Sequence, residues 1–579
     1  MTEILSNVLD QVDREQMMDR IRYMTESFPY RLAGSETEYK ASQYVMQVME
    51  EYGMEPTNLT FRTYNSDPLT SSVEIIAPER FSIDSLPCGH IHSTGDIPEE
   101  YEIVYVGNGS WEEYEGLDVA GKIVLVEVSY APPVPEKAHI AAVKGAVGIL
   151  CMNWGNDEEV ICHRAIKSVW GNPTPESIKD IPDLIGIGIT RLAGLRIKEL
   201  CLSGQTVKAL VSAKATRQWT EVHQPYGIIR GNGKSDEFML VASHLDAWQP
   251  GVTCNATGNA TTLELCRILS ENRDKLDRDV HVVFWNGHEI AEAAGSTWFV
   301  DHFWDLINKK CICYMHIDST GVRETSKLEI KIADELYKFA RENVSYLKDE
   351  ELRIMTLKKI GDQSFMGIGV PGVCQRISFT EEDLEKSHGA TLGWWNHTSE
   401  DDVDKCDPAI LEEDTRLHLA FIWKLVNSEV LPYDFSKKFE MIRANLKPLA
   451  EKYKQHMDFT DILANYEEVE SLVLGLQEKR ESLMPEQTGM FNEFQLSTSR
   501  LLMNIFQTYA SKYDQDRYGH SNLSAPVPLL ADLKKLELLD SASLEYGMIE
   551  TALQRNMNRI TDSLSFLSRL CRLYMSLLA

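Results

Sequence analysis

Three predominantly apolar runs dominate the hydrophobic pattern in the middle of the chain, at 238–242, 280–285 and 311–317. Short runs of this kind are typical of strands that are buried on both faces. A helical pattern of apolar residues at 259–272 lies between the first two runs. Strands that alternate with helices predict a mostly parallel sheet covered by helices. We therefore predict an α/β domain over residues 225–430.

The segment from about 66 to 215 has a different pattern. Short apolar runs at 102–106, 121–126 and 145–150 predict strands, and 138–144 reads as a helix. Before this segment, Ser35 and Glu38 fit a capping box at the start of an amphipathic helix. We expect a small α/β module at 66–215, inserted into a discontinuous first domain made of 1–65 and 216–432.

The chain from 433 to 579 is helical in pattern, with few strand signals. Near its end an apolar seam repeats at steps of four and three residues. The seam consists of Leu553, Met557, Ile560, Leu564, Leu567, Cys571, Tyr574 and Leu578. Such a seam indicates helix packing within the chain, whereas an exposed seam would suit a homodimer formed through this helical domain.

Length and charge restrict the possible functions. A chain of 579 residues exceeds one hydrophobic core, so several domains are expected. The formal net charge of −30 argues against nucleic acid and anionic membranes as partners, because both require a basic surface. No apolar run reaches membrane-spanning length, and the first residues do not resemble a signal peptide. The 11 cysteines include no CxxC pair and predict reduced thiols in a cytoplasmic protein.

The candidate chemistry lies where the predicted strands end. His244 and Asp246 follow the first strand as His–x–Asp, and the later candidates are Cys254, His288, Glu289, Asp318 and His397. Parallel strands place their carboxyl ends together, so these side chains are expected to converge on one cleft. Imidazole, carboxylate and thiolate groups are the ligands that zinc accepts. A metal also explains how carboxylates can be buried together without repelling one another.

Two basic residues in the inserted segment have two possible roles. Arg164 and Lys167 precede the turn-rich stretch Trp170–Pro175, which we expect to be an exposed loop. They are either solvated surface charges or side chains that reach a neighbouring site.

The order of these motifs resembles the zinc-dependent exopeptidases, a family that includes bacterial aminopeptidases, plasma glutamate carboxypeptidase, glutamate carboxypeptidase II and the transferrin receptor. The family pattern runs H-x-D, G-x-x-D-N-x-[ST]-G, G-E-E, a strand-end Asp and H-T-x-x-D. This chain has His244–Asp246, Gly251–Gly258, Gly287–Glu289, Asp318 and His397–Asp401. The loop Pro29–Ser35 and the segment Asp362–Phe365 resemble further family motifs. The resemblance implies an exopeptidase-like sheet with helices on both faces, a protease-associated domain at 66–215 and a dimerisation-like helical domain.

Two positions depart from the family pattern. Cys254 stands where active members have an Asp that bridges two metals, and His288 stands where they have the general-base Glu. The other ligand positions of the family pattern are kept. The resemblance implies that His244 and Asp318 are ligands on one side of the metal site, and Glu289 and His397 on the other side. A metal-bound thiolate favours zinc, so one or two zinc ions are expected as cofactor. Histidine can serve as a general base, so His288 is the expected proton acceptor and Asp246 the residue that orients His244.

The leading hypothesis is therefore a zinc metallopeptidase-like hydrolase that cleaves amide bonds in short peptides or aminoacyl conjugates. The alternative is a catalytically silent dimeric scaffold or binding protein of the same fold, since the transferrin-receptor branch has lost its metal site. A third hypothesis is a single-zinc acyl-transfer enzyme similar to glutaminyl cyclase, with zinc between Cys254, Glu289 and His397. The sequence leaves open the substrate and the choice between aminopeptidase and carboxypeptidase activity.

Overall fold

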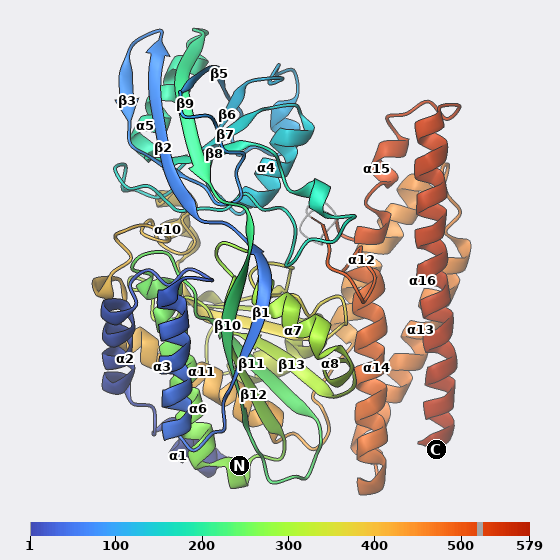
Figure 1. The fold of residues 1–579 in the computed structure, drawn as a ribbon. Helices are drawn as coiled ribbons and strands as arrows, with labels where there is room; N and C mark the ends of the chain where they lie inside the picture. The colour runs from blue at the N-terminus through green and yellow to red at the C-terminus, as the bar shows by residue number, and fades with distance from the viewer. Residues whose placement is uncertain (1, 518–524, 579) are drawn as a thin grey trace.

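The α/β sheet that the apolar runs predict is present in the computed structural model, which describes residues 2–517 and 525–578 (Figure 1). Its eight strands have the order β1-β10-β12-β11-β13-β16-β14-β15. They span Thr57–Asn65 (β1), Gln218–Ile229 (β10), Asp279–Trp285 (β12), Phe238–His244 (β11), Cys311–His316 (β13), Gly372–Ser378 (β16), Lys327–Ile332 (β14) and Leu352–Thr356 (β15). The predicted fold class is confirmed.

The centre of this sheet is parallel. β11 pairs in parallel with β12 and β13, and β13 pairs in parallel with β16. β10 and β14 run antiparallel to their neighbours β12 and β16. The register sets His244 beside Trp285, so the loops that follow β11 and β12 leave the sheet at the same edge.

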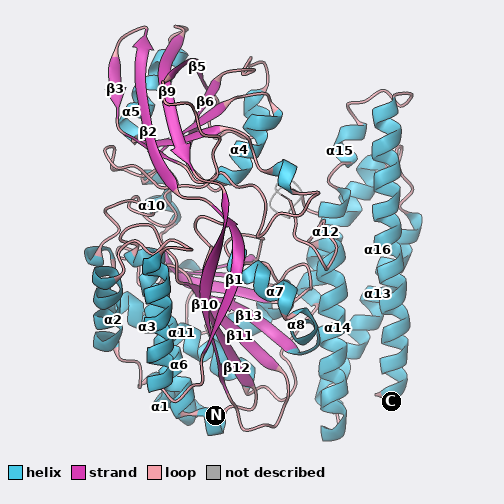
Figure 2. Cartoon of the chain, viewed as in Figure 1, coloured by secondary structure: helices cyan, strands magenta, loops and turns pink. Residues whose placement is uncertain are grey.

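Helices cover both faces of the sheet, as Figure 2 shows. Along β11, Met239 and Val241 join the large core that includes α2, α3, α6 and α11, whereas Leu240 and Ala242 pack on the side of α7 and α8. This alternation explains why the run is apolar at every position. The helices of this domain span Thr2–Leu9 (α1), Arg14–Ser27 (α2), Glu36–Glu51 (α3), Thr257–Glu271 (α6), Ala294–His302 (α7), Trp304–Lys310 (α8), Tyr337–Asn343 (α9), Glu381–Lys386 (α10) and Pro408–Val426 (α11).

A second sheet of eight strands forms the inserted segment, hereafter the insert, with the order β3-β2-β9-β5-β6-β7-β8-β4. Its strands span Pro68–Ala77 (β2), Phe81–Ile83 (β3), Ser85–Pro87 (β4), Glu99–Tyr105 (β5), Ile123–Glu127 (β6), Gly148–Met152 (β7), Ile185–Ile189 (β8) and Val207–Ala215 (β9), with helices Val134–Val143 (α4) and Arg191–Leu202 (α5). β1 leads directly into β2 and β9 into β10, so two adjacent connections join the sheets (Figure 1).

The predicted capping box is half formed. The Ser35 hydroxyl accepts the Glu38 backbone N–H at 3.0 Å and caps α3. The Glu38 carboxylate, however, is fully buried and accepts hydrogen bonds from the Gly34 backbone and the Asn286 amide. The reciprocal bond is absent because Glu38 is recruited into a buried polar network between α3 and the sheet.

The helical part of the chain contains Ser436–Tyr453 (α12), Thr460–Gln477 (α13), Thr488–Phe506 (α14), Leu533–Leu536 (α15) and Leu544–Leu577 (α16). Every residue of the predicted seam is buried, and α16 packs against α13 and α14. Packing within the chain is therefore confirmed for this seam. A different face of α16 remains exposed at Phe566, Leu573 and Leu577.

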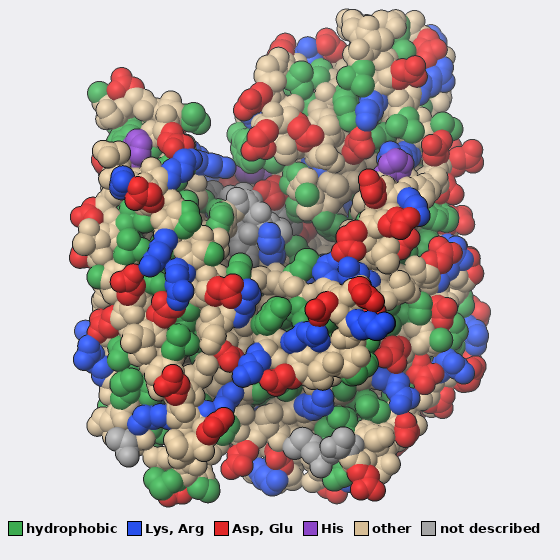
Figure 3. Space-filling model, turned by 180° about the vertical axis from the view of Figure 1, so that it is seen from behind, with side chains coloured by type: hydrophobic (Ala, Val, Ile, Leu, Met, Phe, Trp, Pro, Cys, Tyr) green, Lys and Arg blue, Asp and Glu red, His purple; other side chains and the backbone are tan. Residues whose placement is uncertain are grey.

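Seen from the opposite side, the surface is deeply hollowed between the insert and the helical part, and acidic and basic side chains are interspersed on it (Figure 3). Within the described ranges, none of the helices combines the length and the apolar character needed to cross a bilayer.

One arginine connects the helical part to the sheet domain. Arg500 on α14 donates to the backbone carbonyls of Gly369, Cys311, Ile307 and Asn308. Gly369 has φ of +87°, and a Cβ there would lie 2.5 Å from the Arg500 Cα. The two backbones are therefore in direct contact, and the guanidinium satisfies the carbonyls at the end of α8.

We predict that Arg500→Leu lowers the free energy of unfolding by about 3 kcal/mol, because it leaves several partly buried carbonyls without a donor. Arg569→Leu, which alters an exposed arginine on α16, should change it by less than about 0.5 kcal/mol. Urea unfolding followed by circular dichroism measures both. Equal stabilities of the two variants would contradict the assigned role of Arg500.

Candidate metal and acid–base site

The five residues that the sequence predicts as metal ligands come together at the carboxyl edge of the sheet. His244 ends β11, Cys254 lies in the turn before α6, Glu289 follows β12, Asp318 follows β13 and His397 lies between α10 and α11. The thiol of Cys254 is central: its Sγ lies 3.7 Å from His244 Nε2, 3.4 Å from Glu289 Oε1 and 3.4 Å from His397 Nε2. Asp318 Oδ1 lies 3.5 Å from His244 Nε2, and Glu289 Oε2 lies 3.1 Å from His397 Nε2.

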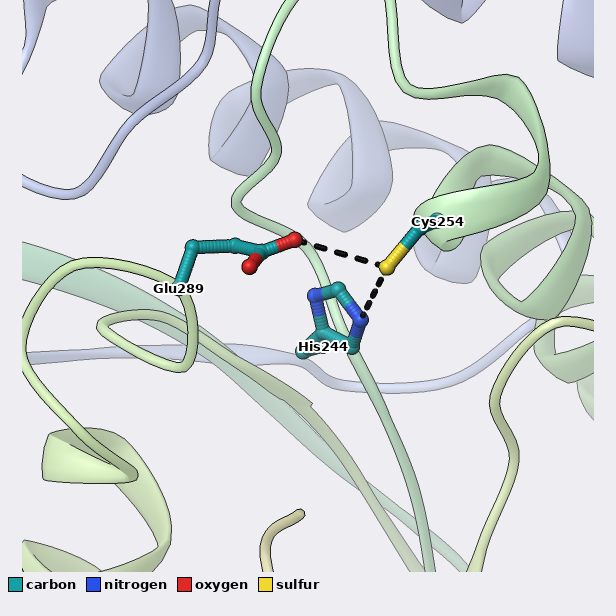
Figure 4. A group of neighbouring side chains, drawn as sticks. All are labelled: His244, Cys254 and Glu289. Carbon is teal, nitrogen blue, oxygen red and sulfur yellow. Dashed lines mark hydrogen bonds between the residues drawn. The ribbon is translucent and has the colours of Figure 1, made fainter. Parts of the chain in front are cut away.

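Three of these residues satisfy the geometry of one metal site. His244, Cys254 and Glu289 are buried, each offers one ligand atom, and these atoms lie within 4.8 Å of one another. Figure 4 shows the three side chains pointing toward one another. Imidazole, thiolate and carboxylate form a donor set that zinc accepts, so the residues fit the metal that the motifs imply.

Buried polar groups hold the loops that carry these donors. Asp246 presents its backbone carbonyl to His244 Nδ1 at 2.9 Å, while its carboxylate accepts the backbone N–H groups of His288 and Glu289. The Asp246 carboxylate is 3.8 Å from His244 Nδ1, so the carbonyl makes the closer contact. Asp401 accepts from the Thr253 and Cys254 backbone and fixes the cysteine turn.

Arg31, in the Pro29–Ser35 loop, stabilises the loop between His244 and Cys254. It is fully buried and donates to the carbonyls of Leu245 and Gly251 at 2.8 and 2.9 Å. Burial lowers its pKa to about 10, although the carboxylates of Asp246 and Asp401 oppose that shift. The guanidinium therefore joins the two ends of the loop between His244 and Cys254.

Charge in the cluster is strongly coupled. Burial alone would raise the pKa of Glu289, but the adjacent His397 and His288 lower it to about 2. Burial, reinforced by the carboxylates of Glu289 and Asp318, raises the pKa of the Cys254 thiol well above 9.0. Cys254 is therefore a thiol without a cation, and metal binding would deprotonate it.

His288 is paired with an acid. Its Nδ1 lies 2.8 Å from Asp362 Oδ2, and its ring stacks on His244 with 3.9 Å between centroids. Because ionised Asp362 can only accept, Nδ1 carries the proton and Nε2 is the remaining site for proton exchange. Burial lowers the pKa of His288, but Asp362 and the nearby Glu289 and Asp318 outweigh this and raise it well above 6.5.

A chain of hydrogen bonds runs from the insert to this pair. Trp170 Nε1 donates to Ser364 Oγ at 2.8 Å, Ser364 and Ser296 share a 2.8 Å bond, and Ser296 Oγ donates to Asp362 Oδ1 at 2.9 Å. Tryptophan can only donate and a carboxylate can only accept, so every bond in the chain has the same direction. Asp362 is thereby held on one oxygen by Ser296 and on the other by His288.

The insert closes over the site. Arg164 and Lys167 are buried, not solvated, and Arg164 Nη1 lies 3.0 Å from His397 Nδ1. Lys167 donates to the Ala291 carbonyl, and burial lowers its pKa to about 7. The prediction of an exposed loop is wrong for its first two residues: Trp170 and Gly171 are buried, and the indole of Trp170 forms part of the cavity wall. Only Thr174 and Pro175 of this stretch are exposed.

A cavity of about 270 Å³ lies over the cluster. The predicted proton acceptor His288 and the predicted metal ligands Glu289, Asp318 and His397 line it, as do Arg164, Trp170, Lys331, Lys359 and Arg376. The arrangement thus brings metal donors, a histidine with an acidic partner and several positive charges together at one cavity.

Sequence reasoning did not assign roles to Asp362, Ser296 or Asp401. Asp362 and Asp401 belong to the motif segments Asp362–Phe365 and His397–Asp401, and their place in these motifs was the sequence feature that could have indicated a role in the site. Ser296, on α7, carried none, because its role depends on a contact with a loop 66 residues away in the chain.

Comparison with known proteins agrees with the resemblance seen in the motifs. Residues 226–422 match Peptidase family M28. Transferrin receptor protein 2 from Homo sapiens is 22% identical over 265 residues, which are 41% of this chain and 32% of the receptor. A glutamate carboxypeptidase 2 homolog from Caenorhabditis briggsae is 20% identical over 404 residues, 54% of this chain and 52% of that protein. The chain thus spans about half, or less, of the length of these curated relatives.

Solved structures share the fold. The aminopeptidase from Aneurinibacillus sp. strain AM-1 superposes with a TM-score of 0.53 at 21% identity, covering 72% of this chain and 95% of the aminopeptidase. The Peptidase M28 precursor from Shewanella amazonensis gives 0.61 at 17% identity, covering 74% of this chain and 97% of that protein. The resemblance to zinc-dependent exopeptidases is confirmed, and the chain has a peptidase-like fold.

We predict that Asp362→Asn destabilises the metal-free protein by about 3 kcal/mol, and that the loss depends on pH. The raised pKa of His288 stabilises the fold below 6.5, and this contribution is lost as the pH rises through the folded-state value. The lowered pKa of Asp362 stabilises above 3.8 and is lost as the pH falls. The destabilisation caused by Asp362→Asn should therefore be largest between pH 3.8 and pH 6.5, and it should decrease as the pH rises above 6.5.

Urea unfolding in the presence of a chelator, from pH 5 to 10, measures this dependence. Asp274→Asn, which alters an exposed carboxylate, serves as the control and should show little trend. A destabilisation by Asp362→Asn that stays constant across the range would exclude the ion pair.

Proposed function

We propose that this protein is a metal-dependent hydrolase of amide bonds, an exopeptidase that acts on short peptides or aminoacyl conjugates. One observation carries the proposal: the His288–Asp362 pair lies beside the His244–Cys254–Glu289 donor cluster, and His288 and Glu289 line one cavity. A base with a fixed tautomer next to metal donors is the combination that hydrolysis of an amide requires.

His244, Cys254 and Glu289 would hold the metal, with Asp318 beside them. A bound zinc ion supplies Lewis acidity, which polarises a carbonyl and lowers the pKa of water. His288 Nε2 takes the proton of the attacking water and delivers it to the leaving amine. Asp362 keeps the imidazole oriented and stabilises it while it carries the proton.

The pKa of His288 fits this role only when a positive charge is near. Without a cation, the surrounding carboxylates raise its pKa and keep it protonated near neutral pH. A dication would repel the imidazolium and lower that pKa, which yields a neutral base. Binding of a cation, which these carboxylates favour, would therefore release His288 as a neutral base.

The volume of the cavity and the basic residues that line it favour a small substrate that carries a negatively charged group. Its volume of about 270 Å³ lies just below the range of about 300–1,000 Å³ that is typical of small-molecule sites. Lys331, Lys359 and Arg376 line it in addition to Arg164. A free carboxylate on the substrate would complement these charges.

A second candidate is the catalytically silent scaffold. The cluster can balance its own charges without metal, because His397 pairs with Glu289 at 3.1 Å and His244 with Asp318 at 3.5 Å. A relative of this chain is named a transferrin receptor. Metal content separates the two candidates.

The exposed face of α16 supports a homodimer through the helical part. Phe566, Leu573 and Leu577 are 50%, 54% and 49% exposed and follow a spacing that places them on one side of the helix. Apolar side chains grouped in this way favour a protein interface. We also propose a cytoplasmic location, since the 11 cysteines are all free thiols and most are buried.

We expect the protein purified after zinc loading to retain zinc and to hydrolyse members of an aminoacyl-amide and dipeptide panel. His288→Ala should lower kcat by about 100- to 10,000-fold while zinc content is unchanged. His302→Ala, at an exposed histidine, is the control. Elemental analysis and steady-state kinetics are the measurements. Zinc-free protein that hydrolyses nothing would favour the scaffold.

We expect light scattering coupled to gel filtration to report about twice the chain mass of 65.8 kDa. Phe566→Glu combined with Leu573→Glu should convert the dimer to a monomer, because it places charges in the apolar face. Leu202→Glu changes a leucine of the insert that is 68% exposed and should leave the mass unchanged. A wild-type monomer would exclude this interface.

A further inference from the structure

His397 has an unusual partner for a residue expected to bind metal. A metal-binding histidine normally donates its second N–H to a carboxylate or a carbonyl, and this leaves the other nitrogen free for the metal. The partner of His397 Nδ1 is instead the guanidinium of Arg164, at 3.0 Å. Both side chains are largely buried, so water does not readily replace this contact.

The chemistry of arginine fixes the tautomer of His397. A guanidinium has five N–H donors and no acceptor, so Nδ1 must offer its lone pair to Arg164. The proton of a neutral imidazole then lies on Nε2. That nitrogen faces Glu289 Oε2 at 3.1 Å and Cys254 Sγ at 3.4 Å, and both are acceptors for it. A nitrogen that carries a proton cannot coordinate a metal.

His244 shows the opposite arrangement. Its Nδ1 faces the backbone carbonyl of Asp246 at 2.9 Å, and a carbonyl can only accept. Nδ1 therefore carries a proton in either protonation state, and in the neutral ring the lone pair of Nε2 faces Cys254 and Asp318. The two histidines of the cluster are thus prepared for different roles, and only His244 is set for metal binding.

Arg164 also brings a fixed positive charge to the Glu289–His397 side of the cluster. It comes from the insert, whose neighbouring residues hold the same loop: the His163 backbone donates to the His397 carbonyl at 2.8 Å. The Cys162 thiol donates to the Asn396 carbonyl at 3.3 Å. The guanidinium is therefore held in place by the packing of the insert on the His397 loop.

We propose that the site takes one divalent metal ion of the zinc type, held by His244, Cys254 and Glu289, and that Arg164 takes the place of a second ion beside His397. The inference rests on the metal-binding part of the proposed function. It differs from the single-zinc arrangement with Cys254, Glu289 and His397, because it assigns His397 as a hydrogen-bond donor to Glu289.

The test is a titration of the chelator-treated full chain with cobalt(II) and with zinc, followed by calorimetry. Cobalt also reports thiolate ligation through a charge-transfer absorption. Wild type should bind one equivalent and show that absorption. His397→Phe, which cannot coordinate, should still bind one equivalent with similar affinity. His244→Phe and Cys254→Ser should bind at least about 100-fold more weakly.

Arg164→Gln tests the second part of the proposal. Without the guanidinium, His397 can adopt the other tautomer, and a second equivalent of metal should bind. Arg164→Lys retains the charge and should remain at one equivalent. Arg191→Gln, which removes another buried arginine of the insert, is the matched control and should also remain at one.

Two equivalents in wild type, or loss of binding in His397→Phe, would overturn the inference and leave the hydrolase proposal standing. No metal binding in wild type would overturn both. One equivalent without hydrolysis of any substrate would support the inference while the proposed activity fails, so the two outcomes are distinguishable. Circular dichroism of each variant verifies that it is folded.

Discussion

The parallel pairing of β11 with β12 and β13 is the constraint on which the rest of the site depends. It sets the carboxyl ends of these strands side by side. His244, Glu289 and Asp318 lie at or just after these ends, so all three are placed at the same edge of the sheet. A shift of one residue in β11 would turn His244 to the other face of the sheet. The apolar residues that pack on both faces of β11 make such a shift costly, so the core fixes the chemistry.

The sequence was most informative where local pattern and long-range structure agree. The three apolar runs located β11, β12 and β13 to within two residues, because a strand buried on both faces leaves a strong apolar signal. The motif order then identified residues that the structure brings into one cluster. Each of these residues lies at a strand end or in a loop, where its position follows from the topology.

Side-chain direction was less predictable. Glu38 left its expected cap for a buried network, and Trp170 turned inward from a loop with strong turn chemistry. From the sequence, Arg164 and Lys167 could be either solvated surface charges or side chains that reach the site. In each case the deciding contact lies in another part of the chain, more than 100 residues away. Local propensity carries no information about such partners.

The two departures from the exopeptidase pattern change the charge of the site. Cys254 and His288 stand in place of two carboxylates, so the cluster contains less negative charge to balance. A thiol can remain neutral until a metal arrives, and an imidazole can be positive when none is present. This explains how the cluster can be buried with Arg164, Arg31, Arg376 and the histidines as its positive neighbours.

The close contact between the insert and the His397 loop has a consequence for how such a protein can evolve. Backbone and side-chain hydrogen bonds from residues 162–164 hold that loop, and Trp170 completes the support of Asp362. Two short, adjacent connections make the insert look like a cassette that recombination could exchange. Its inner surface, however, lines part of the cavity and contacts His397, so a foreign cassette would bring the wrong partners. The insert and the sheet must therefore be inherited together, and their residues should change in concert.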